Sequence, residues 1–301
     1  MINIMKDIYI QDKRLWQVWP GKNRFCCSGK CMTGPKSDLL YYIPSIAALI
    51  VIPNTFFIFA APYIWQKVTV ILPILSVILY LLTLSAYILT TFTDPGIIPR
   101  KTITEIIDHE SSKIDIMSID MSKYCSTCQI FRPRRSHHCK VCDNCVEIFD
   151  HHCPYINNCI GGRNYIFFFL FILNLTLLCL TNIAGCFIFI FHDYSISGPA
   201  KETFIKQGTV SLIIIVIIIV LTTMIGILTT ILCLHHICLC FTGETTKERI
   251  KGEDIGSHCY FCKKKPKKFD PQQILTEEQF KKIVEGPVFI EMSDNENSVS
   301  N

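Results

Sequence analysis

The chain has 301 residues, half of them hydrophobic, and a formal net charge of +4 at pH 7. A charge this small gives no indication of nucleic-acid binding, and the high apolar content excludes an intrinsically disordered chain. The chain has 17 cysteines, a number that indicates metal binding, catalysis or disulfide formation, depending on the redox compartment.

Four long stretches lack Asp, Glu, Lys and Arg, and they run over residues 39–66, 68–93, 166–192 and 207–243. Each exceeds the ~20 apolar residues that a helix needs to cross a hydrocarbon core of about 30 Å. Pro44, Pro53 and Pro62 are expected to kink or delimit the first span. They do not argue against its existence, because neighbouring helices can satisfy the freed backbone groups. We therefore predict an all-α integral membrane protein with four transmembrane helices.

The predicted helices divide the chain into five regions: an N-terminal segment (1–38), helices 1 and 2 (39–93), a cysteine-rich domain (94–165), helices 3 and 4 (166–243) and a C-terminal tail (244–301). Lys and Arg number seven, nine and ten in the first, third and fifth regions, but only one and two in the remaining connections. The positive-inside rule predicts that the three basic regions, and so both termini, face the cytosol. Charges that interrupt the first apolar runs predict no cleavable signal peptide.

Residues 124–165 contain seven cysteines and four histidines, and this density predicts bound zinc. In the two C-x-x-C pairs, Cys125/Cys128 and Cys139/Cys142, the two-residue spacer lets both thiolates bind one tetrahedral ion at ~2.3 Å. A cytosolic location keeps the thiols reduced. The segment has too little apolar material for a core of its own, so metal binding is expected to supply its folding energy.

Two tetrahedral sites need eight ligands, and the count leaves two arrangements open. If both sites are Cys₃His, one cysteine remains free, whereas a Cys₄ site would leave none. Local chemistry favours a free Cys153, because a histidine pair and Asp150 precede it. An acid that orients an imidazole beside a thiol is a general arrangement for activating a nucleophile.

Residues 150–153 read DHHC and are followed by NNCIGGRNY at 157–165, while DPG occurs at 94–96 and TTKE at 245–248. Over roughly residues 40–250, this order of motifs resembles the DHHC family of integral-membrane protein S-acyltransferases. The lead-in WQVWPGKNRFCCSGK at 16–30 further resembles the branch that acylates Ras-like GTPases with a small accessory subunit.

The resemblance implies two structural zinc ions, one bound by Cys125, Cys128, His138 and Cys145, the other by Cys139, Cys142, His152 and Cys159. It implies that Cys153 is the nucleophile, His151 the base and Asp150 the residue that orients the base. The implied reaction transfers a palmitoyl group from palmitoyl-CoA through a thioester on Cys153 to cysteines of cytosolic or membrane proteins. The expected location is an endomembrane, Golgi or ER, with the plasma membrane as the alternative.

Four arginines, Arg132, Arg134, Arg135 and Arg163, are predicted to bind the phosphates of CoA, because guanidinium groups match phosphate oxygens. A belt of positive charge facing lipid headgroups explains them equally well. His137, outside both ligand sets, is expected to make a polar contact or to contact the acyl donor.

The C-terminal tail carries a lysine-rich run, 263–268, which is expected to attract anionic lipid. Cys259 and Cys262 precede it and are predicted to be reversibly lipidated. Two departures from the family pattern stand out. Tyr155 occupies a position where the family usually has Trp, which is expected to alter acyl-chain packing but not the chemistry. No clear aromatic motif follows TTKE, so docking of the tail on the catalytic segment is not predicted.

The alternatives to an acyltransferase are a zinc adaptor and a transporter. A RING-like zinc adaptor anchored in the membrane predicts two filled metal sites and no reactive thiol. A transporter is disfavoured, because the predicted spans lack ionisable groups apart from histidines near their ends.

Overall fold

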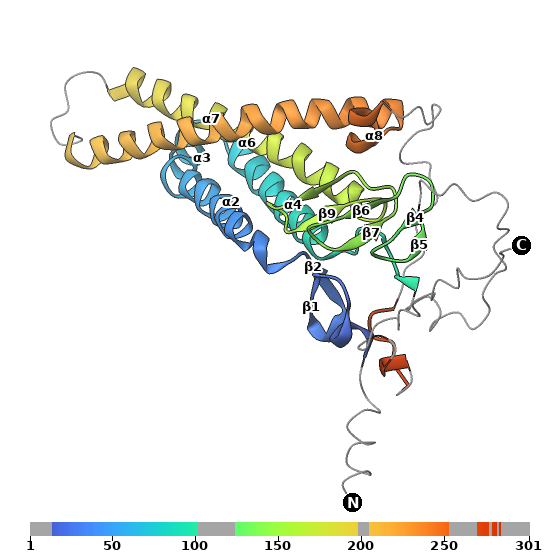
Figure 1. Ribbon diagram of the computed structural model, residues 1–301. Helices are drawn as coiled ribbons and strands as arrows, with labels where there is room; N and C mark the ends of the chain where they lie inside the picture. The colour runs from blue at the N-terminus through green and yellow to red at the C-terminus, as the bar shows by residue number, and fades with distance from the viewer. Residues whose placement is uncertain are drawn as a thin grey trace, which may run out of the picture.

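The computed structural model describes residues 14–101, 124–197, 205–252, 270–276, 279–281 and 283. The connector predicted over residues 102–123, the Cys259/Cys262 pair and the lysine run 263–268 lie outside these residues. The long helices lie side by side, and the short strands are grouped beside one end of α4 and α6 (Figure 1).

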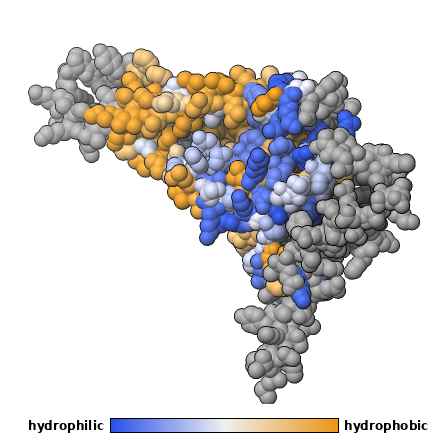
Figure 2. Space-filling model, viewed as in Figure 1, coloured by the Kyte–Doolittle hydropathy of each residue, from blue (hydrophilic) through white to orange (hydrophobic). Residues whose placement is uncertain are grey.

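Four helical stretches are long and apolar enough to cross a membrane, as predicted: Lys36–Lys67, Ile71–Phe92, Tyr165–His192 and Ile213–Thr242. The first contains α2 (Leu39–Phe59) and α3 (Ala61–Lys67), and the second is α4 (Ile71–Phe92). The third and fourth lie within α6 (Tyr165–Ser197) and α7 (Ile205–Thr242). Figure 2 shows hydrophobic residues covering these helices and hydrophilic residues gathering over the strands.

Only one of the three prolines in the first span lies at a helix boundary, whereas all three were expected to kink or delimit the span. Pro44 and Pro53 lie inside α2, and Pro62 occupies the first turn of α3. The first turn tolerates proline because its backbone N–H groups have no partner within the helix. The span is therefore divided into α2 and α3 at Ala60.

Small residues let α6 approach its neighbours closely. A Cβ added at Gly185 would lie 2.8 Å from the Phe56 ring of α2, and one at Gly226 of α7 would lie 3.2 Å from Cβ of Cys179. Close approach of backbones is how helices gain packing energy where lipid removes the hydrophobic driving force. The four helices thus form a bundle.

The cysteine-rich segment is built from three hairpins of strands only two or three residues long. They are β4 (Tyr124–Cys125) with β5 (Ile130–Phe131), β6 (His137–Cys139) with β7 (Asn144–Val146), and β8 (His151–Cys153) with β9 (Asn158–Ile160). The strand β3 (Ile97–Ile98) pairs with β7. The "all-α" description therefore holds for the membrane region, and the segment between helices adds short strands that the sequence analysis did not specify.

Each hairpin turns through a residue with a left-handed backbone: Gln129 (φ 54°), Asp143 (φ 56°) and Asn157 (φ 53°). Asn and Asp visit this region more readily than other non-glycine residues. Such tight turns hold the strand ends, where the cysteines and histidines are located, close together.

The N-terminal lead-in consists of η1 (Leu15–Val18), β1 (Arg24–Cys26), η2 (Cys27–Gly29), β2 (Cys31–Thr33) and η3 (Lys36–Asp38). Residues 270–276 pack along it, where backbone N–H groups of Leu15 and Trp16 donate to the carbonyls of Gln273 and Pro271 at 3.0 and 2.9 Å. Leu15 and Leu275 share a buried cluster with cysteines of the hairpins. The chain beyond TTKE therefore docks near the cysteine-rich segment through the lead-in, a contact that the sequence did not predict.

Candidate active site and metal centres

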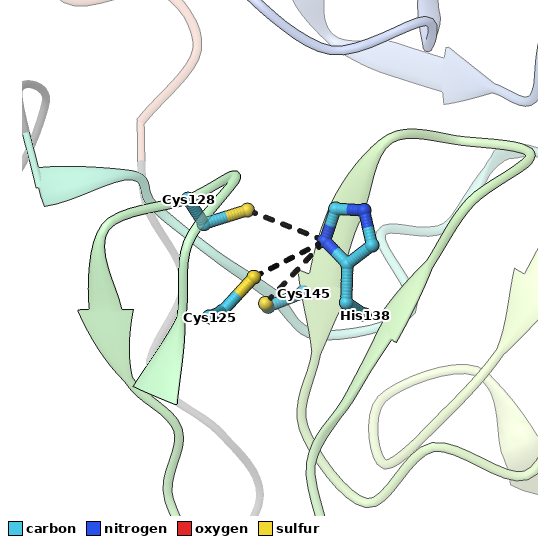
Figure 3. A group of neighbouring side chains, drawn as sticks. All are labelled: Cys125, Cys128, His138 and Cys145. Atoms are coloured by element: carbon cyan, nitrogen blue, oxygen red, sulfur yellow. Dashed lines mark hydrogen bonds between the residues drawn. The ribbon is translucent and has the colours of Figure 1, made fainter. Parts of the chain in front are cut away.

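The first group of potential metal ligands joins two hairpins. Cys125 and Cys128 come from the first hairpin, and His138 lies directly opposite Cys145 in the second. Nδ1 of His138 lies 3.5, 3.5 and 3.7 Å from the three sulfurs, and Figure 3 shows the sulfurs converging on the imidazole. A tetrahedral ion with bonds of about 2.0 Å to nitrogen and 2.3 Å to sulfur separates these atoms by about 3.6 Å. The group therefore fits zinc.

The second group repeats this arrangement between the second and third hairpins. It contains Cys139, Cys142, His152 and Cys159. Nδ1 of His152 lies 3.4 Å from Sγ of Cys142 and 3.5 Å from Sγ of Cys159, and those two sulfurs are 3.5 Å apart. These distances also match the edges of a tetrahedral sulfur–nitrogen site. The two sets of four are the ones that the family resemblance implies.

The thiols in both groups are prepared for metal binding. Hydrogen bonding with Cys145 lowers the pKa of Cys128 to about 5, assisted by His138 and opposed by burial. Hydrogen bonding with Cys142 and Cys159 lowers the pKa of Cys139. Because thiolates are the metal ligands, each group already favours one ionised sulfur.

Both ligand histidines have a carboxylate behind the ring. Oδ2 of Asp38 lies 2.8 Å from Nε2 of His152, and Oδ1 of Asp143 lies 3.5 Å from Nε2 of His138. A carboxylate on the second ring nitrogen fixes the tautomer and raises the basicity of the metal-binding nitrogen. Asp38 is buried at the start of the first span, and sequence reasoning missed it because nothing nearby in the chain marks it.

Strand alternation separates Cys153 from the metal ligands. In the third hairpin His152 is paired with Cys159, whereas Cys153 is paired with Asn158. Successive side chains of a strand point to opposite faces, so His152 faces the second ligand group while His151 and Cys153 share the other face. Cys153 belongs to neither ligand group.

His151 lies between an acid and this thiol. Its Nδ1 is 2.7 Å from Oδ2 of Asp150, so Nε2 is left to exchange a proton. Burial lowers the pKa of His151, but hydrogen bonds with Asp150 and Cys153 outweigh it and raise that pKa to about 10. Asp150 is almost fully buried, and burial raises its pKa while the hydrogen bond from His151 dominates and lowers it. The arrangement stabilises an imidazolium beside the thiol.

Residues 118–253 match the family model described as DHHC palmitoyltransferase. Over this segment, which we call the DHHC domain, the chain is similar to DHHC palmitoyltransferases. It is 35% identical to human palmitoyltransferase ZDHHC18 over 186 residues, covering 55% of this chain and 47% of the relative. It is also 35% identical to mouse palmitoyltransferase ZDHHC14 over 265 residues, covering 81% and 52%. The chain thus spans about half the length of the curated relatives it matches.

The TTKE motif of the DHHC domain positions the Asp150 carboxylate. Thr245 caps α8 (Thr246–Lys251) in a capping box with Glu248. The backbone N–H and the hydroxyl of Thr246 donate to the two carboxylate oxygens of Asp150, each at 2.8 Å. The sequence identified the motif but not these contacts, which fix the orientation of the Asp150 carboxylate toward His151.

His236 of α7 lies near His151. It is buried, its Nδ1 lies 2.9 Å from the Tyr165 hydroxyl, and its ring centroid is 6.3 Å from that of His151. Phe168 packs edge-on against both rings. No role for His236 was predicted from the sequence, because its position on the last span does not indicate which residues it faces.

A cavity of about 810 Å³ opens at Cys153 and continues between the helices. Its walls are almost entirely apolar and come from α2, α6, α7, Tyr87 of α4 and the third hairpin, and it reaches Asn182 and Thr222. From Phe168 to Asn182, α6 advances about 21 Å at 1.5 Å per residue. Fifteen carbon–carbon bonds of ~1.5 Å in a zigzag chain span about 19 Å. The cavity thus has the length and polarity that a sixteen-carbon chain needs.

Tyr155 lies at the mouth of this cavity. Its ring meets Tyr41 edge-on, at 6.0 Å between centroids, and its carbonyl accepts hydrogen bonds from the hydroxyls of Ser45 and Tyr87 at 2.8 and 2.9 Å. The backbone contacts do not depend on the side chain. Tyrosine therefore fits at this position beside the DHHC cysteine.

Two of the four arginines that were predicted to bind CoA phosphates have carboxylate partners within the fold. Arg135 forms a largely buried ion pair with Glu248 and donates to the Gly243 carbonyl at 2.9 Å. Arg163 lies 3.3 Å from the Asp94 carboxylate of the DPG motif. Both guanidinium groups therefore have structural partners, and binding of CoA phosphates would have to compete with them.

The other two arginines are Arg134, which is exposed, and Arg132, which is half-buried. Burial lowers the pKa of His137 to about 4, and Lys247, Lys251 and Arg132 add to the effect. His137 is thus neutral at pH 7 in a positively charged area.

Proposed function

We propose that this protein transfers a long-chain acyl group, typically palmitoyl, from acyl-CoA to cysteine thiols of cytosolic or membrane proteins. The observation that carries the proposal is the position of Cys153. It lies outside both metal-ligand groups, beside the Asp150–His151 pair, at the opening of an apolar cavity among membrane helices.

In the first step His151 accepts the proton of Cys153, and the thiolate attacks the thioester carbonyl carbon of acyl-CoA. The sulfur–carbonyl bond to CoA breaks, and the departing thiolate takes a proton from the imidazolium. Asp150 stabilises that imidazolium through the 2.7 Å contact with Nδ1. Positioned proton transfer and an activated thiol are the two rate-enhancing features of this step.

In the second step the thiol of a substrate protein gives its proton to His151 and attacks the acyl group on Cys153. The thioester bond to Cys153 breaks, and its sulfur recovers the proton. The zinc ions, held by the two groups of four ligands, would maintain the hairpins that position these residues. Each CH₂ of the acyl chain buried in the cavity contributes ~0.8 kcal/mol, which favours binding of long chains.

Arg132 and Arg134 are proposed to attract the phosphates of CoA, supported by the positive charge around His137. Contacts between the lead-in, residues 270–276 and the hairpins support a common location for both terminal regions on one side of the membrane, which the positive-inside rule assigns to the cytosol. The lead-in sequence supports Ras-like GTPases as substrates and a small accessory subunit. An endomembrane, Golgi or ER, is the proposed location.

The test is Cys153→Ser in the purified full chain. We expect the variant to lose thioester labelling from radioactive palmitoyl-CoA while it keeps two zinc ions. Cys238→Ser, at an exposed cysteine of α7, is the matched control and should be labelled normally. Loss of one zinc from Cys153→Ser, or labelling equal to that of the wild type, would show that this thiol is not the acyl carrier. A wild type that binds two zinc ions but never takes label would favour the zinc adaptor.

A further inference from the structure

A third cluster of thiols lies in the lead-in, away from the DHHC cysteine. Cys26 ends β1, Cys27 begins η2 and Cys31 begins β2, and their three sulfurs lie within 4.8 Å of one another. None of the three belongs to the two zinc groups. Cys26 and Cys27 are exposed and Cys31 is half-buried, so an ion from solution can reach them.

The fold of the hairpin brings these sulfurs together. Cys26 and Cys31 are directly paired across β1 and β2. The turn between them contains three successive residues with left-handed backbones, Cys27 (φ 50°), Ser28 (φ 56°) and Gly29 (φ 89°). Non-glycine residues adopt this conformation at an energetic cost, and here it returns Cys27 toward the cross-strand pair.

The turn is held from outside the hairpin. The Trp16 side chain packs so closely on Gly29 that an added Cβ would lie 2.5 Å from its ring. The side-chain amide of Gln272 donates to the Ser28 carbonyl at 2.9 Å. Trp16 and Gln272 therefore stabilise the turn that brings the three thiols together.

We propose that the thiolates of Cys26, Cys27 and Cys31 form a third metal site, which binds the thiophilic ion Cu(I). Within the described part of the chain, no fourth histidine, cysteine or carboxylate joins this group. Structural zinc requires four ligands, whereas soft thiolates select Cu(I), which is stable with three. If the three cysteines were instead lipidated separately, their sulfurs would not need to lie within 4.8 Å of one another.

This site does not include Cys153, and it connects to the DHHC domain through β2, whose Met32 side chain packs in the buried cluster that contains Cys139 and Cys159. The strand β2 continues into Gly34, whose N–H donates to the Asn157 carbonyl at 2.6 Å. Loading the site would cross-link β1 to β2 without touching Cys153. Its failure would leave the proposed function intact.

The experiment uses the reduced, zinc-loaded full chain in detergent without oxygen, with Cu(I) supplied from a chromogenic chelator. We expect one copper ion per chain beside two zinc ions, with only sulfur ligands in the X-ray absorption spectrum. Cys26→Ser/Cys31→Ser removes two of the three ligands and should weaken copper binding by more than the roughly 10- to 100-fold that loss of a partner behind a ligand costs. Cys27→Ser is the second variant and should weaken binding likewise, and zinc content of two reports correct folding in each.

Cys238→Ser, at an exposed cysteine outside the cluster, is the control and should bind copper like the wild type. Three outcomes overturn the proposal. These are equal copper uptake by the wild type and both cluster variants, displacement of zinc by copper, and a Cys26–Cys31 disulfide that persists in reductant.

Discussion

Asp38 offers a sharp test of how the start of the first span supports the DHHC zinc sites. Its side chain is 7% exposed, and its carboxylate lies 2.8 Å from Nε2 of His152. A hydrogen bond to a charged group contributes about 1.5–3 kcal/mol, and every 1.4 kcal/mol is tenfold in affinity. Asp38→Ala should therefore weaken zinc binding at the second group roughly 10- to 100-fold, in line with other carboxylates behind zinc-binding histidines.

Asp143 provides a matched control, because it stands behind His138 at 3.5 Å, is 28% exposed, and also pairs with Arg100. A partly exposed ion pair contributes about 0–1 kcal/mol, so Asp143→Ala should weaken the first group less than about tenfold. Asp38→Asn keeps an acceptor oxygen and should lose less affinity than Asp38→Ala.

The assay follows zinc release from the purified protein in the presence of a graded chelator and a metal-sensitive dye. Asp38→Ala should release one of its two zinc ions at low chelator concentration and the other at the wild-type concentration. Identical release from Asp38→Ala, Asp143→Ala and wild type would refute the argument, as would a first zinc lost from the group that contains His138.

Three further variants probe contacts between distant segments. Arg135→Ala leaves the buried Glu248 carboxylate without its ion-pair partner and should lower the free energy of unfolding by about 3–5 kcal/mol. The loss is measured as a lower thermal midpoint in detergent, and adding Glu248→Gln should partly restore that midpoint. Thr246→Val removes one of two hydrogen bonds to Asp150 and should slow thioester formation about 10- to 100-fold with zinc content unchanged, whereas an equal rate would exclude a positioning role. Gly161→Ala would place a methyl group 2.5 Å from a backbone oxygen of the DPG motif and should destabilise the hairpins by about 1–3 kcal/mol, seen as faster zinc loss on heating.

Properties that depend on nearby residues could be predicted from the sequence. The four spans follow from uninterrupted apolar runs, because length and the absence of charge decide whether a helix can cross a bilayer. The presence of zinc sites follows from C-x-x-C spacing, since a two-residue spacer by itself brings two sulfurs to one ion. The sequence alone left one point open, whether a cysteine remained free. Alternation along β8 turns His152 toward Cys159 and Cys153 away from it.

Properties that depend on contacts between distant segments were decided only by the tertiary structure. Asp38 is 114 residues from His152, Thr246 is 96 from Asp150, and Glu248 is 113 from Arg135. No local pattern marks such partners, because their encounter depends on how the helices pack and where the chain leaves the membrane. The same reason explains why the sequence grouped four arginines as phosphate ligands although two of them have carboxylate partners within the fold.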